Sequence, residues 1–318
     1  MSWLKSTSPM TRSGSAQIDA VLSRAQQIIF GKQNQLQLAL CALFADGHAL
    51  VEDVPGVGKT TLVRTLATLL GLKTTRIQFT NDLLPADILG TTVFDAKDQR
   101  FVFHPGPIFG QVVIADELNR ATPKTQSALL QAMEERRVTI DGITHELPLP
   151  FFVIATQNPS EQMGTYPLPE SQLDRFMLRI DMGFPDRKSE AELLKGERRE
   201  GLMRDLQPVV NLDDLKVWQK EVKAVHVSDA IVEYLQNLIE YTRSRPTEMQ
   251  GLSPRAGLAW LSAARAWAFI HDRQMVLPED IQAVGVAIMG HRLRHSRNLD
   301  SAVGIRLARQ VLDSVAVD

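Results

Sequence analysis

A glycine-rich run ending in lysine and threonine is the part of this chain best suited to binding a charged ligand. Residues 52–61 read EDVPGVGKTT. Gly56 and Gly58 would let successive backbone N–H groups turn toward phosphate oxygens, and the N-terminus of a following helix would add partial positive charge. Lys59 would neutralise the outer phosphates, and the hydroxyl of Thr60 would ligate Mg²⁺. The run therefore predicts a site for ATP or GTP.

The residues expected to contact the nucleotide belong to this loop and to the first helical turn after it. They are Pro55, Gly56, Val57, Gly58, Lys59, Thr60 and Thr61. One position departs from the general pattern G-x-x-x-x-G-K-[ST], because Asp53 replaces its first glycine. A carboxylate facing the phosphates would repel them, so we expect Asp53 to point away and to structure the turn. An ordinary glycine–proline turn before a surface helix is the alternative.

A pair of adjacent carboxylates further along the chain supplies the chemistry that a bound triphosphate needs. Residues 111–117 read QVVIADE, an apolar strand that would deliver both carboxylates at its C-terminal end, where ligands of open parallel sheets bind. Asp116 would hold Mg²⁺ through its water shell, and Glu117 would orient and polarise the attacking water. A strand ending in Asp-Glu often leads only into a solvated loop. Because this strand follows a phosphate loop in the sequence, its two carboxylates favour a role in the same site, as the groups that bind the metal ion and the attacking water.

The elements that must position these residues can be read from the alternation of apolar runs and helical patterns. Short strands are expected at 49–51, 75–79, 112–115, 151–156 and 177–180. Their alternation with helices predicts an α/β fold with a mostly parallel sheet covered on both faces. Beyond Pro185, amphipathic helices dominate, and Ser253-Pro254 reads as a cap followed by the first helical residue. We expect a flexible tail over 1–16, an ATPase core over 17–185 and an all-α lid over 186–318.

Two hairpins are expected to interrupt the α/β part. Residues 91–103 alternate apolar and polar side chains around a polar turn. Residues 136–149 do the same around Asp141-Gly142, a strong hairpin signal. Both could be plain extensions of the sheet. A projecting role in contact with a partner is an equal alternative.

Composition narrows the class of protein. With 318 residues and 44% hydrophobic content, the chain can bury the core of two domains, and its formal charge of −2 gives no global attraction to nucleic acid. The single cysteine, Cys41, excludes a disulfide framework and suits a core position. The apolar runs are too short to cross a bilayer, and the Ser/Thr-rich start has no apolar export region. These features predict a cytoplasmic protein without membrane insertion.

Five ordered motifs now resemble one family. Behind EDVPGVGKT come ADELNRATPKTQSALLQAMEERRVT, ATQNP, GTYPLPESQLDRF and SPRA. In this order they closely resemble the MoxR group of AAA+ ATPases over most of residues 30–270. The resemblance implies a five-stranded core with a helix-2 insert hairpin and a pre-sensor-1 hairpin, a helical lid and ring assembly, usually hexameric. It also implies Mg²⁺-dependent ATP hydrolysis and chaperone-like remodelling of protein clients, often with von Willebrand factor A domain proteins.

The resemblance assigns three further site residues. Asn158 corresponds to sensor 1, and it follows the apolar run FFVIAT, so its amide could lie beside the terminal phosphate. Arg175 of LDRF corresponds to the arginine finger, although it could instead pair locally with Asp174. Arg255 of SPRA corresponds to sensor 2. A cation in the first turn of a helix is disfavoured by the helix dipole, so an approaching anion such as the nucleotide would explain it.

Several alternatives stay open at this point. The stretch HRLRHSR, at 291–297, could touch phosphate, although a solvated helix end is the simpler interpretation. Arg120 and Lys124, beside the acidic pair, could face a neighbouring subunit. A nucleic-acid motor of the same superfamily would need a basic surface that the charge of −2 does not supply. A nucleotide switch that does not hydrolyse is disfavoured by the intact Glu117.

Overall fold

The computed structural model describes residues 14–52, 57–157, 164–194, 197–293 and 301–317. Three of the expected site residues, Pro55, Gly56 and Asn158, lie outside these ranges, and so do Asp53 and the expected tail up to residue 13. The first helix, α1, begins at Ser15. None of the helices in the described part of the chain is long and apolar enough to cross a bilayer.

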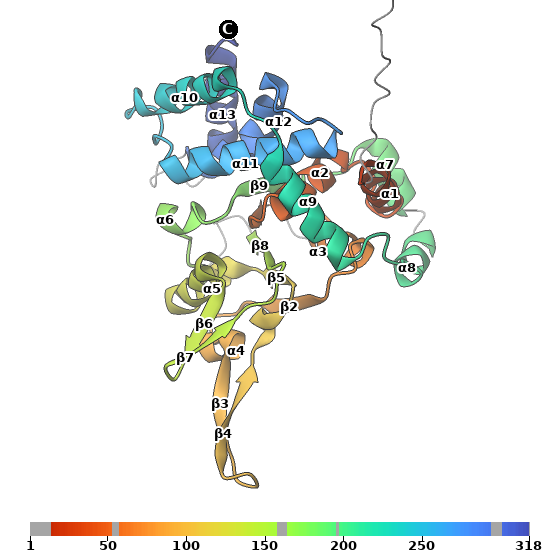
Figure 1. The fold of residues 1–318 in the computed structure, drawn as a ribbon, viewed down its shortest axis with the longest axis vertical. Coiled ribbons are helices and arrows are strands. Elements are labelled where there is room, and N and C mark those ends of the chain that lie inside the picture. Colours follow the sequence, from red (N-terminus) through yellow and green to blue (C-terminus); the bar gives the residue numbers. More distant parts are fainter. Residues whose placement is uncertain (1–13, 53–56, 158–163, 195–196, 294–300, 318) are drawn as a thin grey trace, which may run out of the picture.

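A five-stranded parallel sheet forms the centre of the molecule (Figure 1). The strand order is β2-β5-β8-β1-β9, and each neighbouring pair is parallel. The strands are β1 (Ala49–Glu52), β2 (Thr74–Gln78), β5 (Val112–Asp116), β8 (Phe152–Gln157) and β9 (Leu178–Asp181). They lie within one residue of the predicted positions. Because all of them run the same way, the sheet has one edge at which every strand begins and one at which every strand ends.

Helices cover both faces of this sheet because its central strands are apolar on both sides. In β5, Val112 and Ile114 pack into one hydrophobic cluster, whereas Val113 and Ala115 pack into the other. Successive side chains of a strand point to opposite faces, so one continuous apolar run serves two cores. The helices of the core are α1 (Ser15–Gln26), α2 (Gln33–Phe44), α3 (Lys59–Leu69), α4 (Pro85–Leu89), α5 (Pro123–Glu135) and α6 (Glu170–Leu173), with short 3₁₀ turns at η1 (Pro107–Phe109) and η2 (Leu118–Arg120).

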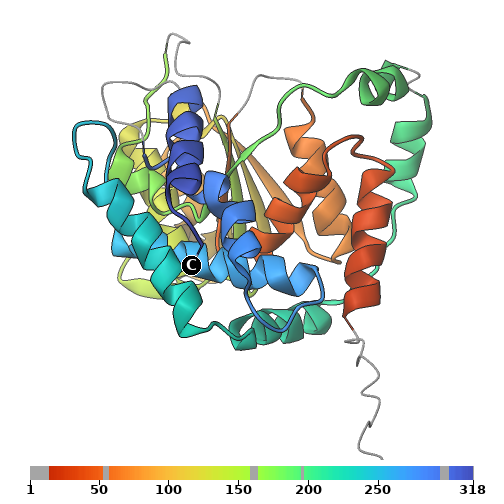
Figure 2. The ribbon, with the colours of Figure 1, turned by 90° about the horizontal axis from the view of Figure 1, so that it is seen from above.

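The C-terminal part is helical, as expected. Its helices are α7 (Arg187–Leu194), α8 (Glu197–Arg204), α9 (Leu212–Ala224), α10 (Asp229–Arg243), α11 (Pro254–Ile270), α12 (Pro278–Met289) and α13 (Ser301–Ser314). The predicted cap before α11 is confirmed, because the Ser253 hydroxyl accepts a 3.0 Å hydrogen bond from the backbone N–H of Ala256. Helix α11 packs on α2, and Figure 2 shows the blue lid helices beside the red and orange helices of the core. Cys41 is buried in the cluster that joins them, and burial raises the pKa of its thiol.

Both predicted hairpins are present, as separate two-stranded sheets rather than extensions of the central one. The first joins β3 (Gly90–Asp95) to β4 (Arg100–Pro105) and projects from the core at the bottom of Figure 1. The second joins β6 (Arg137–Ile140) to β7 (Ile143–Glu146), and its turn residues Asp141 and Gly142 have φ values of 50° and 78°. The rings of Phe103 and His145 stack with centroids 3.9 Å apart, so the hairpins contact each other.

Candidate functional site

The start of helix α3 faces the edge at which the strands end. Gly58 precedes the helix with φ of 91°, a left-handed conformation that favours glycine, and α3 begins at Lys59. The backbone N–H groups of a first helical turn have no partner within the helix and attract anions. Val57, Thr60 and Thr61 lie in this segment and are partly exposed. Strand, loop and helix therefore follow one another in the order that the sequence predicts.

Asp116 is held at the end of β5 by the strands on either side. Its carboxylate accepts a 2.9 Å hydrogen bond from the hydroxyl of Thr156 on β8 and a 2.8 Å hydrogen bond from Nε of Arg76 on β2. The carboxylate is mostly buried, with a side-chain exposure of 10%. Hydroxyl and carboxylate oxygens are the ligands that Mg²⁺ prefers. The fixed carboxylate of Asp116 therefore suits a cation that is also held by phosphate oxygens.

Glu117 turns the chain sharply immediately after β5. Its backbone is left-handed, with φ of 56°, an uncommon conformation for a residue with a side chain. Its backbone N–H donates a 2.9 Å hydrogen bond to the Thr156 hydroxyl, and its carboxylate accepts hydrogen bonds from Gln78 at 3.0 Å and Arg120 at 2.9 Å. The carboxylate thus lies at the same edge as Asp116. Within the chain, Arg120 forms an ion pair with Glu117.

Thr156 is a site residue that sequence reasoning missed. Its hydroxyl donates to Asp116 and accepts from Glu117, so one buried side chain positions both members of the acidic pair. The sequence feature that could have indicated Thr156 is its place at the end of the apolar run FFVIAT. The structure places that run on β8, the strand next to β5. Within the described residues, no group of three or more His, Cys, Asp or Glu side chains could hold a metal ion by itself. The donors present instead suit Mg²⁺ bound through one or two protein oxygens and phosphates.

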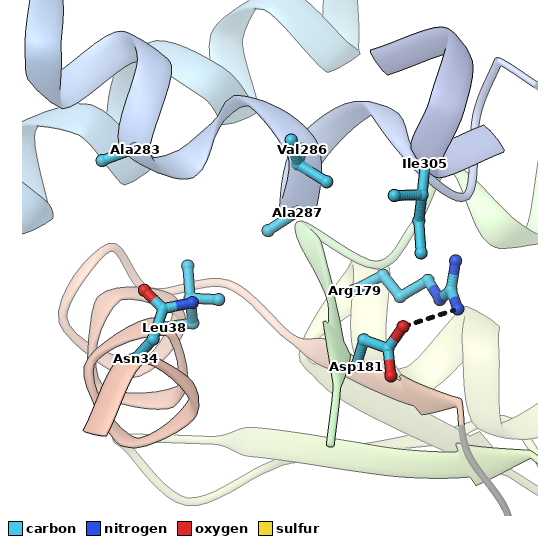
Figure 3. A pocket seen from close by; sticks show the side chains of 8 residues that line it. All are labelled: Asn34, Leu38, Arg179, Asp181, Ala283, Val286, Ala287 and Ile305. Atoms are coloured by element: carbon cyan, nitrogen blue, oxygen red, sulfur yellow. Dashed lines mark ion pairs between the residues drawn. The ribbon is translucent and has the colours of Figure 1, made fainter. Parts of the chain in front are cut away.

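A cavity of about 110 Å³ adjoins the end of β1 (Figure 3). It lies between helix α2, strand β9 and the lid. Arg179 on its wall is 4% exposed and pairs at 2.9 Å with Glu52, the last residue of β1. The cavity therefore lies beside the end of β1. Its lining residues are Asn34, Leu38, Arg179, Asp181, Ala283, Val286, Ala287 and Ile305.

Arg175 and Arg255 lie at the opposite edge, where the strands begin. The backbone N–H of Met177 donates to the carbonyl oxygen of His48 at 2.8 Å, just ahead of the paired strands β9 and β1. Arg175 pairs with Glu134 at 3.2 Å, and Arg255 pairs with the other oxygen of the same carboxylate. A strand of four or five residues is about 13–16 Å long. In this structure both arginines therefore lie about one strand length away from the edge at which helix α3 begins.

The local alternative for Arg175 is not what the structure shows, because Arg175 pairs with Glu134 and the Asp174 carboxylate pairs with Arg292 at 2.7 Å. The interpretation of the basic stretch at 291–297 was wrong for its first two residues. His291 and Arg292 do not form a solvated helix end, because both are buried. The anion beside Arg255 is the carboxylate of Glu134. The residues at 294–297 of that basic stretch lie outside the described part of the chain.

The fold and site define a P-loop ATPase, and comparison with known proteins agrees. The model of the ATPase family associated with various cellular activities matches residues 48–178, and that of the AAA lid domain matches residues 240–310. A crystal structure of a protein from Cytophaga hutchinsonii assigned as an ATPase superposes with a TM-score of 0.86 at 35% identity, covering 96% of each chain. The protein is an ATP-hydrolysing enzyme.

Individual relatives narrow the family further. The chain is 45% identical to the uncharacterized protein YeaC of Bacillus subtilis, over 92% of each sequence. It is 38% identical to Chaperone MoxR1 of Mycobacterium tuberculosis, over 87% of this chain and 75% of that protein. It is 30% identical to Protein MoxR of Paracoccus denitrificans, over 84% and 85%. The chain belongs to the MoxR family of AAA+ ATPases.

Proposed function

We propose that this ATPase hydrolyses ATP with Mg²⁺ at sites shared between neighbouring subunits of a ring. The observation that supports sharing is the separation of the catalytic groups. Lys59, Asp116 and Glu117 lie where the strands end, whereas Arg175 and Arg255 lie where they begin. Stacking subunits so that one edge faces the next would bring the two sets together. The ring is proposed to be hexameric, as the family resemblance implies.

Each residue has a proposed step within such a shared site. The N–H groups after Gly58 and the ammonium of Lys59 would hold the phosphates, and Thr60 and Asp116 would hold Mg²⁺. The bound ion would neutralise phosphate charge. Glu117 would orient and polarise the attacking water, with the amide of Asn158 beside the terminal phosphate. Arg175 and Arg255 of the neighbouring subunit would stabilise the charge that spreads over the transferred phosphoryl group.

The nucleotide base and ribose are proposed to enter the cavity beside β1. Its lid side is apolar, from Ala283, Val286, Ala287 and Ile305, and its floor carries Arg179 and Asp181. Apolar walls with a few polar groups are typical of small-molecule sites. Replacing Ala287 with Phe would fill this space, and it should raise the ATP concentration needed for half-maximal hydrolysis. An unchanged value would place the base elsewhere.

The client is proposed to be a protein that is remodelled by the ring, and a von Willebrand factor A domain protein is one candidate. The projecting hairpin β3–β4 supports this role because it carries exposed apolar rings at Phe94 (52% exposed) and Phe101 (73% exposed), which contact each other edge to face. Val93 is also exposed on this hairpin, and contiguous exposed apolar side chains mark interaction surfaces. Phe101→Ser should leave ATP hydrolysis intact and reduce the capture of clients by the Glu117→Gln variant, which should hold ATP.

Mixed rings test the shared site directly. Arg175→Ala should bind ATP normally and should hydrolyse it about 10³- to 10⁵-fold more slowly, the range known for arginine fingers. Glu117→Gln should also be nearly inactive. Mixing the two variants pairs the intact Glu117 of one subunit with the intact Arg175 of its neighbour, so hydrolysis should partly return. If subunits exchange and no mixing ratio restores phosphate release, Arg175 does not act in trans.

A further inference from the structure

The guanidinium of Arg292, just after helix α12, is buried at the edge where the strands begin. Its side chain is 5% exposed. An arginine has five N–H donors, and here all five are used. Nε donates to the Asp174 carboxylate at 2.7 Å, and Nη1 donates to the carbonyl oxygens of Met177 at 3.0 Å and Ile288 at 2.6 Å. Nη2 donates to the carbonyl oxygens of Phe176 at 2.6 Å and Asp174 at 3.3 Å.

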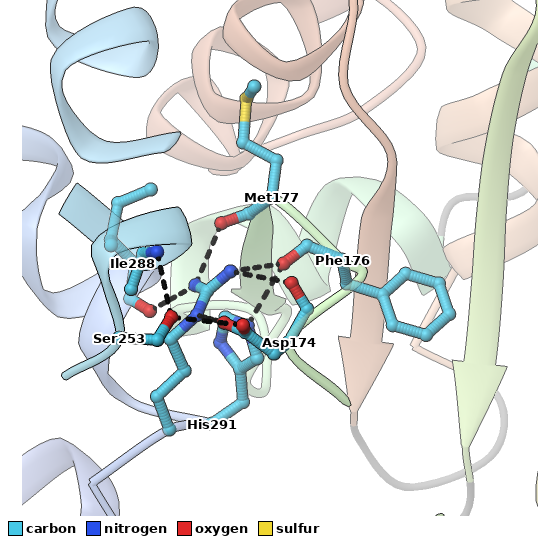
Figure 4. Close-up of polar contacts among 8 residues, drawn as sticks. Asp174, Phe176, Met177, Ser253, Ile288 and His291 are labelled. Carbon is cyan, nitrogen blue, oxygen red and sulfur yellow. Dashed lines mark hydrogen bonds and ion pairs between the residues drawn. The ribbon is translucent and has the colours of Figure 1, made fainter. Parts of the chain in front are cut away.

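These contacts enclose one short segment of the core. Asp174, Phe176 and Met177 flank Arg175 on both sides, and Ile288 belongs to the lid (Figure 4). The Arg292 side chain therefore fixes the backbone around Arg175 to the end of α12. A buried charge whose hydrogen bonds are all satisfied is costly to displace, because each lost partner leaves a desolvated group.

Asp174 also connects this segment to the helix that carries Arg255, the second arginine proposed to act on the neighbouring subunit. Its other carboxylate oxygen accepts a 3.0 Å hydrogen bond from Ser253, the residue that caps helix α11. Arg255 follows in the first turn of α11 and meets Arg175 on Glu134. One carboxylate thus joins the end of α12 and the start of α11 to the segment that carries Arg175. The backbone of that segment has hydrogen bonds to the lid on both sides of Arg175.

We propose that Arg292 is a positioning residue for the neighbouring subunit's reaction. It holds the segment around Arg175 against the lid, so that Arg175 and Arg255 are presented together as one unit and move with the lid. The inference rests on the proposed trans action of Arg175. It goes beyond that action because it assigns the alignment of both arginines to a residue that touches no substrate. Binding of ATP by the same subunit should not depend on it.

The test uses Arg292→Gln, which removes the charge and most of the donors. A displacement of about 1 Å in a catalytic group can cost about 10²-fold in rate, so kcat of homogeneous rings should fall by up to about 100-fold. The ATP-induced thermal shift and the KM for ATP should stay close to wild type. Arg245→Gln is the matched control, because the Arg245 guanidinium lies over the Tyr241 ring within the lid, 3.7 Å from its centroid, and belongs to none of the contacts that join Arg292, Asp174 and Ser253. Its rate should be unchanged.

Mixed rings separate positioning from a merely structural role. Arg292→Gln subunits mixed with Glu117→Gln subunits should regain hydrolysis, because the first supplies an intact Glu117 and the second an intact Arg175 segment. Arg292→Gln mixed with Arg175→Ala should not recover, because both defects lie on the same face. For a folded Arg292→Gln variant, recovery in both mixtures or in neither, a wild-type rate, a lost ATP-induced shift, or failure to enter rings would each overturn the proposal.

A substitute variant and a parallel mixture separate the positioning role of Arg292 from the shared site itself. If Arg292→Gln does not fold, Asp174→Asn removes the same ion pair with little change in shape, and it should show the same pattern of recovery with a smaller loss of kcat. The mixture of Arg175→Ala with Glu117→Gln is run in parallel. If that mixture fails, the shared site itself is wrong. If it recovers while the Arg292→Gln mixture with Glu117→Gln does not, only the positioning role is wrong.

Discussion

The two edges of the central sheet are built in different ways. Where the strands end, Thr156 and Asp116 meet because their strands are neighbours, and only 40 residues separate them along the chain. Where the strands begin, Arg292 lies 118 residues from Asp174, and Arg255 lies 121 residues from Glu134. The first edge is assembled by the sheet itself, and the second requires the lid to be docked. The groups proposed to bind phosphate and metal thus depend on the order of the strands, whereas the arginines proposed to act on a neighbouring subunit depend on long-range packing.

The largest expected effect on ATP binding belongs to the edge where the strands end. Glu117→Gln keeps the shape of the side chain and removes its charge, so ATP binding should persist while kcat falls about 10²- to 10⁴-fold, the usual contribution of a general base.

Lys59→Ala should instead lose ATP binding. ATP at about 100 times its dissociation constant would stabilise the fold by about 2.7 kcal/mol, which a thermal shift detects. A normal shift in Lys59→Ala would show that the phosphates are held elsewhere.

A buried histidine makes the contribution of the edge where the strands begin to stability depend on pH. His48 lies there, with Nδ1 accepting from the backbone N–H of Val153 at 3.1 Å and Nε2 at 3.2 Å from the carbonyl oxygen of Met133. Burial lowers its pKa from 6.5 to about 4, with a smaller contribution from Arg136. Between those values the unfolded chain binds a proton that the folded chain does not, so the free energy of unfolding falls as the pH falls.

The size of this effect follows from the shift. At 1.36 kcal/mol per pKa unit, lowering the pH from 7 to 4 should remove about 3 kcal/mol of stability through His48 alone. Urea unfolding at several pH values measures the slope. His48→Gln should flatten it between pH 6.5 and 4, whereas the exposed His104→Gln serves as a control that leaves it steep. An identical slope in both variants would assign the acid sensitivity to other groups.

The smallest expected change in stability and rate concerns Thr156, at the edge where the strands end. Thr156→Val removes one hydroxyl and keeps the volume of the side chain, leaving Asp116 and the Glu117 N–H without that partner. A buried group left unpaired costs about 1–3 kcal/mol. Stability should fall by about that amount, and kcat should fall about tenfold because both carboxylates lose their alignment. Thr139→Val, which removes an exposed hydroxyl contact in hairpin β6–β7, should change neither. An unaltered kcat in Thr156→Val would mean that the neighbouring contacts alone align the acidic pair.

Much of the first edge is predictable from the sequence because it depends on short-range geometry. The run GVGKTT requires a left-handed Gly58 and a helix that begins at Lys59, and both are present. The apolar run before Asp116 predicts a buried strand, and the turn signal Asp141-Gly142 predicts a hairpin. In each case, residues that are neighbours in the chain decide the outcome. Strand ends could therefore be placed within one residue.

The partners at the second edge could not be predicted in the same way. The stretch around Arg292 looks solvated in the sequence because it is basic and follows an amphipathic helix, yet docking of the lid buries it against the carbonyl oxygens around Arg175. The order of the strands decides that Thr156 lies beside Asp116, and periodicity carries no information about strand order. The sequence by itself determined which residues can bind phosphate and how each short element folds. Only the tertiary structure decided which arginine lies on which edge, because burial, ion pairing and distance from the phosphate loop depend on how distant elements pack.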